Sequence, residues 1–576
     1  MLKKFSNLQK ILIIIFLGFI LVFGIISINR YSLTSDETCY LGVGKSIIET
    51  GNFKINVPVY HPPLSYYIGS LFLYPLNIDK DVLQSYSCWE IGKNVAFYSG
   101  YNPDRIIFFS RLPFVLLSLI LGIYVLIWAT KLFGPTSGVI ALFLYSFDPS
   151  IIAYSSIHTP DFTVASMFFI ASYYFWKLIR ETSIFNLISS GIFLGLALSS
   201  KISAILLIPI MIIIGFAAVY TNKYNLGLKA LIKNLIYIFA ISYLAVFLLF
   251  GLQFGTLSDS LAPGHFSQKT RQELGNTGAL SGTLLYIYDN IPVPTPSYWA
   301  ELGGLFYLSA QESRGYAFGE ITKNVPWYYA YLTFLLKTGV PVLIFLVILL
   351  VKRKNFKKID ITTKLSLLLP VALMFLNFSL TNKMSGVRHI LTIYPFISVL
   401  ASNVINAHAK NRKLYKIFIF ILLAYYGLTA FLISPNFISY VNELGGGPNN
   451  AHKIMVGSNI DQGHDLKELK KFIDKNGIKN IKLSYFGNAN PKDYNITFEY
   501  LPSPSFLYWV PDYTLLKIKE REEDCSPKKG MIAISVTNLK NVHLINKTCF
   551  KWLENYEPVK KIGYSIFIYN INSGKS

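Results

Sequence analysis

Long uncharged runs of apolar residues, separated by short loops rich in lysine and arginine, constrain this chain more than any other feature. A run of about 17–25 apolar residues crosses the hydrocarbon core of a bilayer as one helix. Hydrophobic residues make up 52% of the 576 residues, which is high for a soluble protein. We expect about eleven spans, near residues 11–29, 107–130, 137–155, 161–179, 184–200, 202–220, 235–254, 328–351, 365–381, 390–408 and 416–433. The sequence therefore predicts a polytopic α-helical membrane protein.

The distribution of positive charge predicts the orientation of these spans. Lys and Arg concentrate in loops that fall on one side when the spans alternate, and the positive-inside rule makes that side the cytoplasm. The N-terminus is then inside and the C-terminus outside. The same distribution explains the net charge of +22, so no nucleic-acid partner is expected. The first span lacks a cleavage site and is expected to be a signal anchor in the cell membrane.

Three segments on the outer side are too long to be simple connections. They are the first loop, 30–106, which we expect to carry the catalytic groups, the loop 255–327, and the tail 434–576. Residues 1–433 then form a transmembrane domain. The tail forms an extracytoplasmic domain.

The tail has the patterns of a soluble α/β domain. Apolar residues recur at helical spacing over 466–472, and strands are expected over 481–485, 531–536 and 565–569. Asp465 directly precedes the helical segment and is a candidate for its N-cap.

The four cysteines all fall on the outer side, with two in the first loop and two in the tail. Thiols stay oxidised only outside the cytosol, so Cys39–Cys88 and Cys525–Cys549 are candidate disulfides. The alternative is four buried free cysteines, which are common in protein cores.

An adjacent carboxylate pair, Asp36 and Glu37, follows the first span within two turns of chain. A carboxylate that is desolvated at a membrane surface suits a general base that takes a proton from an acceptor hydroxyl. Neighbouring residues of a helix point about 100° apart, so only one of the two can address a given substrate atom. The alternative is that both acids mark the outer end of a helix.

Further polar groups recur at the same outer boundary. His61 is fixed by the two prolines that follow it, and it suits a phosphate contact, a metal ligand or a structural turn. Cations on the outside oppose the positive-inside trend, and one anionic ligand such as a polyprenyl phosphate would explain them together. The alternatives are snorkelling for Lys201 and Arg388 and a helix N-cap for Asp161. The other groups at this boundary are Arg111, His158, Lys383 and His389.

Five short motifs occur in order along the chain, and two further blocks lie in the tail. The motifs are Ser35-Asp36-Glu37, His61-Pro62-Pro63-Leu64, His158-Thr159-Pro160-Asp161, Leu198-Ser199-Ser200-Lys201 and 386–395, and the blocks are 440–448 and 457–467. Together they resemble the signature series of the protein O-mannosyltransferase and aminoarabinose transferase superfamily, in its prokaryotic form. These proteins are membrane glycosyltransferases of the GT-C fold. The resemblance runs from the first span to the tail.

The resemblance implies inverting transfer of a sugar, mannose or a similar hexose, from a polyprenyl- or dolichyl-phosphate donor to an acceptor hydroxyl outside the membrane. The acceptor is a protein or a glycolipid, with protein O-glycosylation favoured. Asp36 maps to the family's base, with Glu37 beside it. The residues that map to phosphate, donor or substrate contacts are His61, Arg111, Asp161, Lys201, Arg388 and His389. This scheme requires no cofactor, and a divalent metal stays open.

Other interpretations of the chain stay open at this point. A glycan- or glycolipid-building transferase of the same fold has the same sequence features. A transporter or flippase is also polytopic, but it predicts charged or broken helices at mid-membrane, whereas the polar groups here gather at one face. A structural or receptor role for the outer domain would leave the charged groups of the first loop unexplained.

Overall fold

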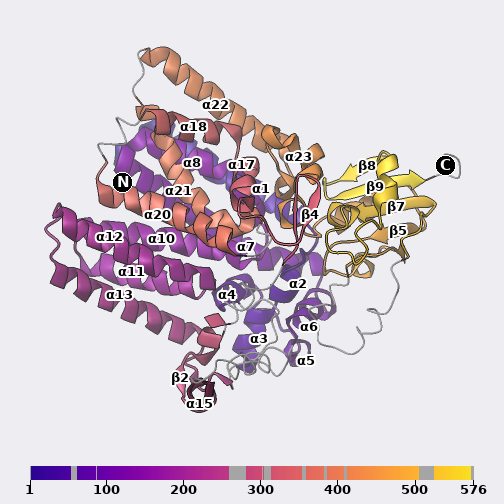
Figure 1. Cartoon of the computed structure of the whole chain (residues 1–576), viewed down its shortest axis with the longest axis horizontal. Helices are drawn as coiled ribbons and strands as arrows, with labels where there is room; N and C mark the ends of the chain where they lie inside the picture. The colour runs from indigo at the N-terminus through magenta and orange to yellow at the C-terminus, as the bar shows by residue number, and fades with distance from the viewer. Residues whose placement is uncertain are drawn as a thin grey trace.

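The structure is a computed structural model of the chain, shown in Figure 1. It describes residues 2–53, 61–85, 87–258, 281–300, 302–303, 313–352, 359–381, 386–407, 411–504 and 524–571. The long helices lie side by side in one half of the molecule and a β-sheet lies in the other (Figure 1).

The helical half is built from apolar helices, most of them joined by short connections, with the two long segments 30–106 and 255–327 between them. They are α1 (Asn7–Arg30), α7 (Pro103–Phe133), α8 (Pro135–Ser146), α9 (Pro149–Ser155), α10 (Pro160–Arg180), α11 (Ile184–Leu198), η3 (Ile202–Leu206), α12 (Leu207–Thr221), α13 (Leu228–Leu249), α17 (Tyr329–Lys337), α18 (Val340–Val351), α20 (Ile361–Leu380), η6 (Val387–Ile393), α21 (Tyr394–Ser402), η7 (Asn403–Asn406) and α22 (Arg412–Ile433). Their starts carry ordinary signals: Ser6 and Gln9 form a capping box at α1, and Asn102 caps α7.

Eight helices of the described residues are long and apolar enough to cross a membrane. Two bent pairs, α8 with α9 at 61° and α17 with α18 at 111°, bring the number to ten if each pair is one span. The 15-residue helix α11 is shorter but apolar. Each of the eleven predicted ranges thus contains a helix or a helix pair, and the polytopic architecture is confirmed. The orientation of the spans stays a prediction.

The first loop folds into short helices at the end of the bundle that faces the sheet (Figure 1). These are α2 (Glu37–Tyr40), α3 (Val43–Thr50), α4 (Leu64–Ser70), α5 (Lys80–Leu83), α6 (Cys88–Lys93) and the π-helix η2 (Asn94–Tyr98). The Cys39–Cys88 disulfide joins α2 to α6. The second predicted disulfide, Cys525–Cys549, is also present in the tail.

The second long segment that was predicted to lie outside, 255–327, contributes little regular structure within the described residues. It contains two small antiparallel pairs, β1 (Phe254–Gly255) with β2 (Val293–Pro294) and β3 (Gly315–Ala317) with β4 (Glu320–Thr322), and the helix α15 (Ser281–Asn290). Residues 259–280, 301 and 304–312 of this loop lie outside the described residues.

The tail forms a five-stranded mixed sheet, as an α/β domain requires. Its strand order is β6-β5-β7-β9-β8, with β5 parallel to β6 and β7, and β9 antiparallel to β7 and β8. The strands are β5 (Ile481–Ser484), β6 (Phe498–Tyr500), β7 (Gly530–Ser535), β8 (Lys560–Ile562) and β9 (Ile566–Ile571). The tail also contains the short helices η8 (Phe437–Ser439), η9 (Glu443–Gly445), α23 (Gly447–Asn450), η10 (Ala451–Lys453), η11 (Gly457–Asn459), α24 (Leu466–Lys475), η12 (Pro491–Tyr494), α26 (Val536–Leu539) and η15 (Lys551–Asn555). The predicted helix and three strands are all found.

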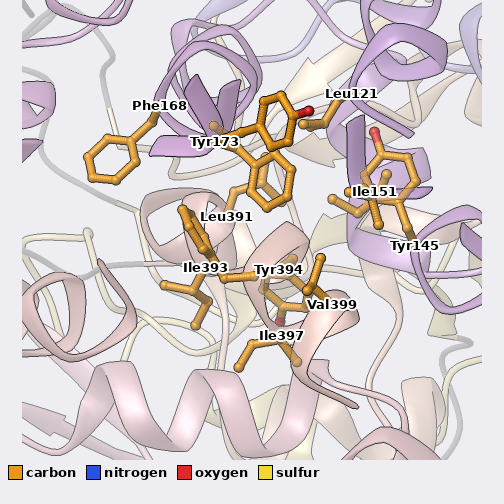
Figure 2. Packing of buried hydrophobic residues seen from close by; sticks show 14 of the residues in the cluster. Leu121, Tyr145, Ile151, Phe168, Tyr173, Leu391, Ile393, Tyr394, Ile397 and Val399 are labelled. Atoms are coloured by element: carbon orange, nitrogen blue, oxygen red, sulfur yellow. The ribbon is translucent and has the colours of Figure 1, made fainter. Parts of the chain in front are cut away.

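Two of the apolar cores bear directly on the position of the first loop. One fills the bundle, where side chains of α7, α8, α9 and α10 interdigitate with those of η6 and α21 (Figure 2). The other is shared: residues of the first loop such as Tyr40 and Ile91 pack in one cluster with Leu466 and Ile481 of the tail. Because burial of apolar side chains is favourable, the tail stabilises the first loop directly.

Candidate active site

The first loop places its two carboxylates at the start of α2. Asp36 occupies the N-cap position and Glu37 is the first helical residue. A Cβ on Gly92 would lie 1.9 Å from the carbonyl oxygen of Thr38 in α2. Only a glycine therefore allows α6 to approach α2 so closely, and the disulfide between the two helices fixes the arrangement.

Glu37 is buried in an ion pair with Arg111 of α7. Its Oε1 accepts from Arg111 Nε at 2.8 Å and its Oε2 accepts from the same guanidinium at 2.6 Å. The backbone N–H groups of His158 and Thr34 donate to the same carboxylate at 2.6 and 2.9 Å. The other guanidinium N–H groups donate to the carbonyls of Ile28, Tyr31 and Ser32 at 3.1, 2.8 and 2.8 Å.

This pair corrects two of the predicted roles. Both side chains are only 1% exposed, and every N–H group of Arg111 already has an acceptor, so Arg111 has no donor left for a phosphate. Burial alone would raise the pKa of Glu37, but the charge and hydrogen bonds of Arg111 outweigh it and hold the pKa below its ordinary value. Glu37 and Arg111 therefore fix the path of the loop, and neither is placed to contact substrate.

His158 joins the same buried framework. Its Nε2 lies 3.0 Å from the Ser65 carbonyl, which can only accept, so Nε2 carries the proton and Nδ1 accepts from Ser110 Oγ at 3.0 Å. Burial lowers the pKa of His158 to about 4. A Cβ on Gly69 would lie 2.1 Å from the ring. This neutral histidine thus docks α4 against the bundle.

Asp36 has a different environment from Glu37 and pairs with Arg388 of η6. The side chains of Asp36 and Arg388 keep 28% and 22% of their surface exposed, so the pair borders solvent. The Nε–H of Arg388 is buried and makes no hydrogen bond with any described residue. Asp36 therefore combines access to solvent with a neighbouring cation that has an unused donor.

A second ion pair lies at the start of α10. Lys201 Nζ donates to Asp161 Oδ1 at 2.5 Å, and the two side chains are 12% and 5% exposed. Asp161 is the second residue of α10, where the helix dipole favours a negative charge. The predicted residues Asp161 and Lys201 are thus brought together, as partners of each other.

Tyr40 of α2 faces both ion pairs. Burial raises the pKa of its phenol well above the ordinary value, and the charges of Asp36, Arg388 and Asp161 all act on it. The His61 ring lies 5.9 Å from the Tyr40 ring, between centroids. The structure therefore gathers Asp36, Arg388, Asp161, Lys201 and His61 around one buried tyrosine.

His389 follows Arg388 but packs elsewhere, with its ring centroid 5.5 Å from that of Phe378 in α20. Lys383, the other cation predicted at this boundary, lies outside the described residues. Asp465 stands at the N-cap position of α24 as predicted, but its side chain makes no cap hydrogen bond. It accepts instead from Arg30 at 3.2 Å and from Ser565 Oγ at 2.6 Å.

Several polar residues next to the site were not predicted. Tyr40 and Tyr154 lack any charge or motif that would mark them. Asn459 and Gln462 belong to the tail block 457–467, for which no role was predicted, and both are buried. The sequence carries no signal of their burial, which becomes visible only in the fold, where such groups need specific hydrogen-bond partners. Among the described residues, no three His, Cys, Asp or Glu side chains cluster as metal ligands do.

Residues 106–250 match the family model described as dolichyl-phosphate-mannose-protein mannosyltransferase. Over this segment the chain is similar to that family of membrane glycosyltransferases. The segment contains Asp161, Lys201 and the structural Arg111, whereas Asp36 and Arg388 lie outside it. The family predicted from the short motifs is thereby confirmed over this segment.

The chain is also similar to solved structures of low sequence identity. ArnT from Cupriavidus metallidurans bound to undecaprenyl phosphate has 9% identity and a TM-score of 0.48, over 96% of this chain and 97% of that one. The apo oligosaccharyltransferase of Archaeoglobus fulgidus has 14% identity and a TM-score of 0.46, over 91% and 70%. The S. cerevisiae Pmt1-Pmt2 complex bound to the sugar donor has 15% identity and a TM-score of 0.33, over 43% and 34%. No curated protein sequence matches the chain.

Proposed function

We propose that this protein transfers a hexose, mannose or a close relative, from a polyprenyl-phosphate donor to a hydroxyl group of a protein outside the membrane. The observation that carries the proposal is the Asp36–Arg388 pair, which borders solvent next to the Asp161–Lys201 pair. The family of residues 106–250 supports both the reaction class and the protein acceptor.

Asp36 acts as the general base in this proposal. It takes the proton of the acceptor hydroxyl as the oxygen attacks the anomeric carbon of the sugar. The bond between that carbon and the phosphate oxygen breaks, and the polyprenyl phosphate leaves as a monoester with one additional negative charge. Inversion follows, because the attacking oxygen enters opposite the leaving group.

The two cations of the site hold the phosphate. The Nε–H of Arg388 has no acceptor among the described residues, and Lys201 supplies a point charge beside Asp161. Fixed charges placed where negative charge develops lower the barrier of such a transfer. The lipid tail of the donor stays in the bilayer, so the membrane itself is part of donor recognition. His61, whose ring lies 5.9 Å from the Tyr40 ring, is proposed to contact the sugar or the acceptor.

The test is transfer of label from radiolabelled polyprenyl-phosphate mannose by membranes that contain the wild type, Asp36→Asn or Asp81→Asn. Asp81 is an exposed aspartate of the same loop that has no place in the site, and it serves as the matched control. We expect label in the protein phase with the wild type and Asp81→Asn only. Equal transfer by Asp36→Asn would remove Asp36 from the mechanism. Label in the lipid phase would assign a glycolipid acceptor, and no transfer by folded wild type would exclude this donor.

A further inference from the structure

One short segment of the tail, residues 457–465, runs between the first loop and the turn that carries Arg388. It begins with η11 (Gly457–Asn459) and ends just before α24. Apart from Ser458, its residues are buried, including the polar Asn459 and Gln462 at 1% and 4% exposure. Buried polar groups are normally hydrogen-bonded, so these side chains require specific partners.

On one side, the segment holds the strand of chain that leads to Asp36. The carbonyl of Gln462 accepts from the backbone N–H of Ser35 at 2.8 Å, and that of His464 accepts from Ser32 N–H at 3.0 Å. Ser35 directly precedes Asp36. The position of the catalytic carboxylate is therefore set by a hydrogen bond to the tail.

On the other side, the segment holds the residue before Arg388. The side-chain oxygen of Asn459 accepts from the backbone N–H of Val387 at 2.9 Å. The approach is close, because a Cβ on Gly386 would lie 2.1 Å from Ser458 Oγ. Both members of the Asp36–Arg388 pair are thus anchored one residue upstream, by groups only three positions apart in the tail.

Asn459 is itself held from the bundle. The buried Lys337 of α17 donates to its backbone carbonyl at 2.6 Å, and its side-chain nitrogen donates to Tyr329 OH at 3.2 Å. The side-chain oxygen, the side-chain nitrogen and the backbone carbonyl of Asn459 are all hydrogen-bonded, so its side chain is held in one orientation. Asn459 can therefore hold the backbone of Val387 in a fixed position.

The same segment reaches the site through Tyr154 of α9. The Tyr154 hydroxyl donates to the Ser458 carbonyl at 2.8 Å and accepts from Gln462 Nε2 at 2.6 Å. The chain that leads to α2, the start of η6, and α9 therefore meet on one stretch of the tail.

We propose that Asn459 is a positioning residue of the active site, which sets the distance and angle between Asp36 and Arg388 through Val387 and the adjoining Gln462 carbonyl. This inference rests on the proposed function. Small displacements of reacting groups have large effects on rate, since about 1 Å of misplacement costs on the order of 100-fold. The tail domain is then a part of the catalytic machinery rather than an appendage.

The experiment compares Asn459→Leu with Asn538→Leu and Asn459→Asp. Asn538 is a buried asparagine of the same domain whose side-chain nitrogen donates to Ser484 Oγ of β5 at 3.0 Å. We expect Asn459→Leu to lower kcat about 10- to 100-fold, with a much smaller change in the KM of the donor, because Lys201 and the lipid tail still bind it. Asn538→Leu keeps the wild-type kcat even if it lowers the melting temperature. Asn459→Asp keeps the acceptor for Val387 N–H, so we expect it to retain most of the wild-type kcat.

A second measurement does not depend on activity. Amide hydrogen exchange of the peptide over 386–393 is expected to speed up in Asn459→Leu and to stay unchanged in Asn538→Leu. If Asn459→Leu fails to fold, Gly386→Ala decides, because its methyl group displaces the Arg388 turn from Ser458 and is expected to cause the same loss of kcat.

The proposal is overturned if kcat and exchange in Asn459→Leu equal the wild type, or if Asn538→Leu loses as much activity. Wild-type protein that transfers no label, together with faster exchange in Asn459→Leu alone, would instead leave the positioning role standing and remove the proposed reaction.

Discussion

Removal of the charge from Glu37 and from Asp36 is expected to have opposite consequences, although the two residues are neighbours. Glu37→Gln leaves Arg111 as a buried cation without its counter-ion, and the new amide nitrogen must face N–H groups. The lost carboxylate accepted four hydrogen bonds of 2.6–2.9 Å. Breaking a buried pair by removing one partner costs about 3–5 kcal/mol, and the completeness of this network favours the upper half of that range.

Two measurements on detergent-solubilised protein test this. Thermal unfolding is expected at a clearly lower temperature for Glu37→Gln and at the wild-type temperature for Asp36→Asn. Sugar transfer, measured well below both transitions and divided by the folded fraction, is expected to persist in Glu37→Gln and to vanish in Asp36→Asn.

A double-mutant cycle supplies the magnitude of the pair. Glu37→Leu combined with Arg111→Met is expected to be less destabilised than the sum of the single changes, since a buried ion pair replaced by apolar groups is often tolerated. If Glu37→Gln instead kept its unfolding temperature and lost transfer, Glu37 would be a catalytic group and the reasoning from burial would be wrong.

Three other perturbations have defined outcomes. His158 stays neutral in the folded protein, because its pKa is about 4 against the ordinary 6.5. As the pH falls from 6.5 to 4, the unfolded chain binds a proton that the folded protein does not, so stability falls by about 1.4 kcal/mol per pH unit. The dependence of the melting temperature on pH in this window should therefore be weaker in His158→Gln. Burial raises the pKa of Asp461 in the tail from 3.8 to about 7. Its contribution to the free energy of unfolding is therefore full below pH 3.8 and is lost as the pH rises to 7. Asp461→Asn should stabilise the protein by about 1–4 kcal/mol at pH 8, and melting at pH 4 should show no such gain. The Cys39–Cys88 bond closes a separation of 49 residues, so its replacement by two serines should cost about 4 kcal/mol, seen as a lower melting temperature under non-reducing conditions.

The sequence patterns were sufficient for the elements that depend on local composition. Apolar run length predicted every span, and alternation predicted β5, β7 and β9, whose residues are mostly buried. The three-residue edge strands β6 and β8 were missed, because they are short and exposed in part and carry no alternation to detect. The cysteine pairing followed from the division of the four cysteines between two separate regions, the first loop and the tail.

The pairing of charges could not be predicted, because it depends on contacts distant in the chain. Asp36 and Glu37 carry the same sequence signal, yet one pairs with Arg388, 352 positions away, and the other with Arg111. The helical geometry predicted only that they would point in different directions. The packing of α2 against α7 and the tail determines which of the two carboxylates is buried. No pattern within the first loop contains that information.

The charges of the site also fit the proposed reaction at each stage. In the structure, the negative charges of Asp36 and Asp161 are balanced by the positive charges of Arg388 and Lys201, and a bound donor phosphodiester would add one negative charge. Transfer creates a second negative charge on the leaving phosphate, while the proton taken by Asp36 cancels one on the protein. The net charge of the site is therefore the same before and after the step. Protonation of Asp36 also releases Arg388 from its partner at the moment when the phosphate needs it, so the one ion pair of the site that borders solvent couples acceptor activation to leaving-group stabilisation.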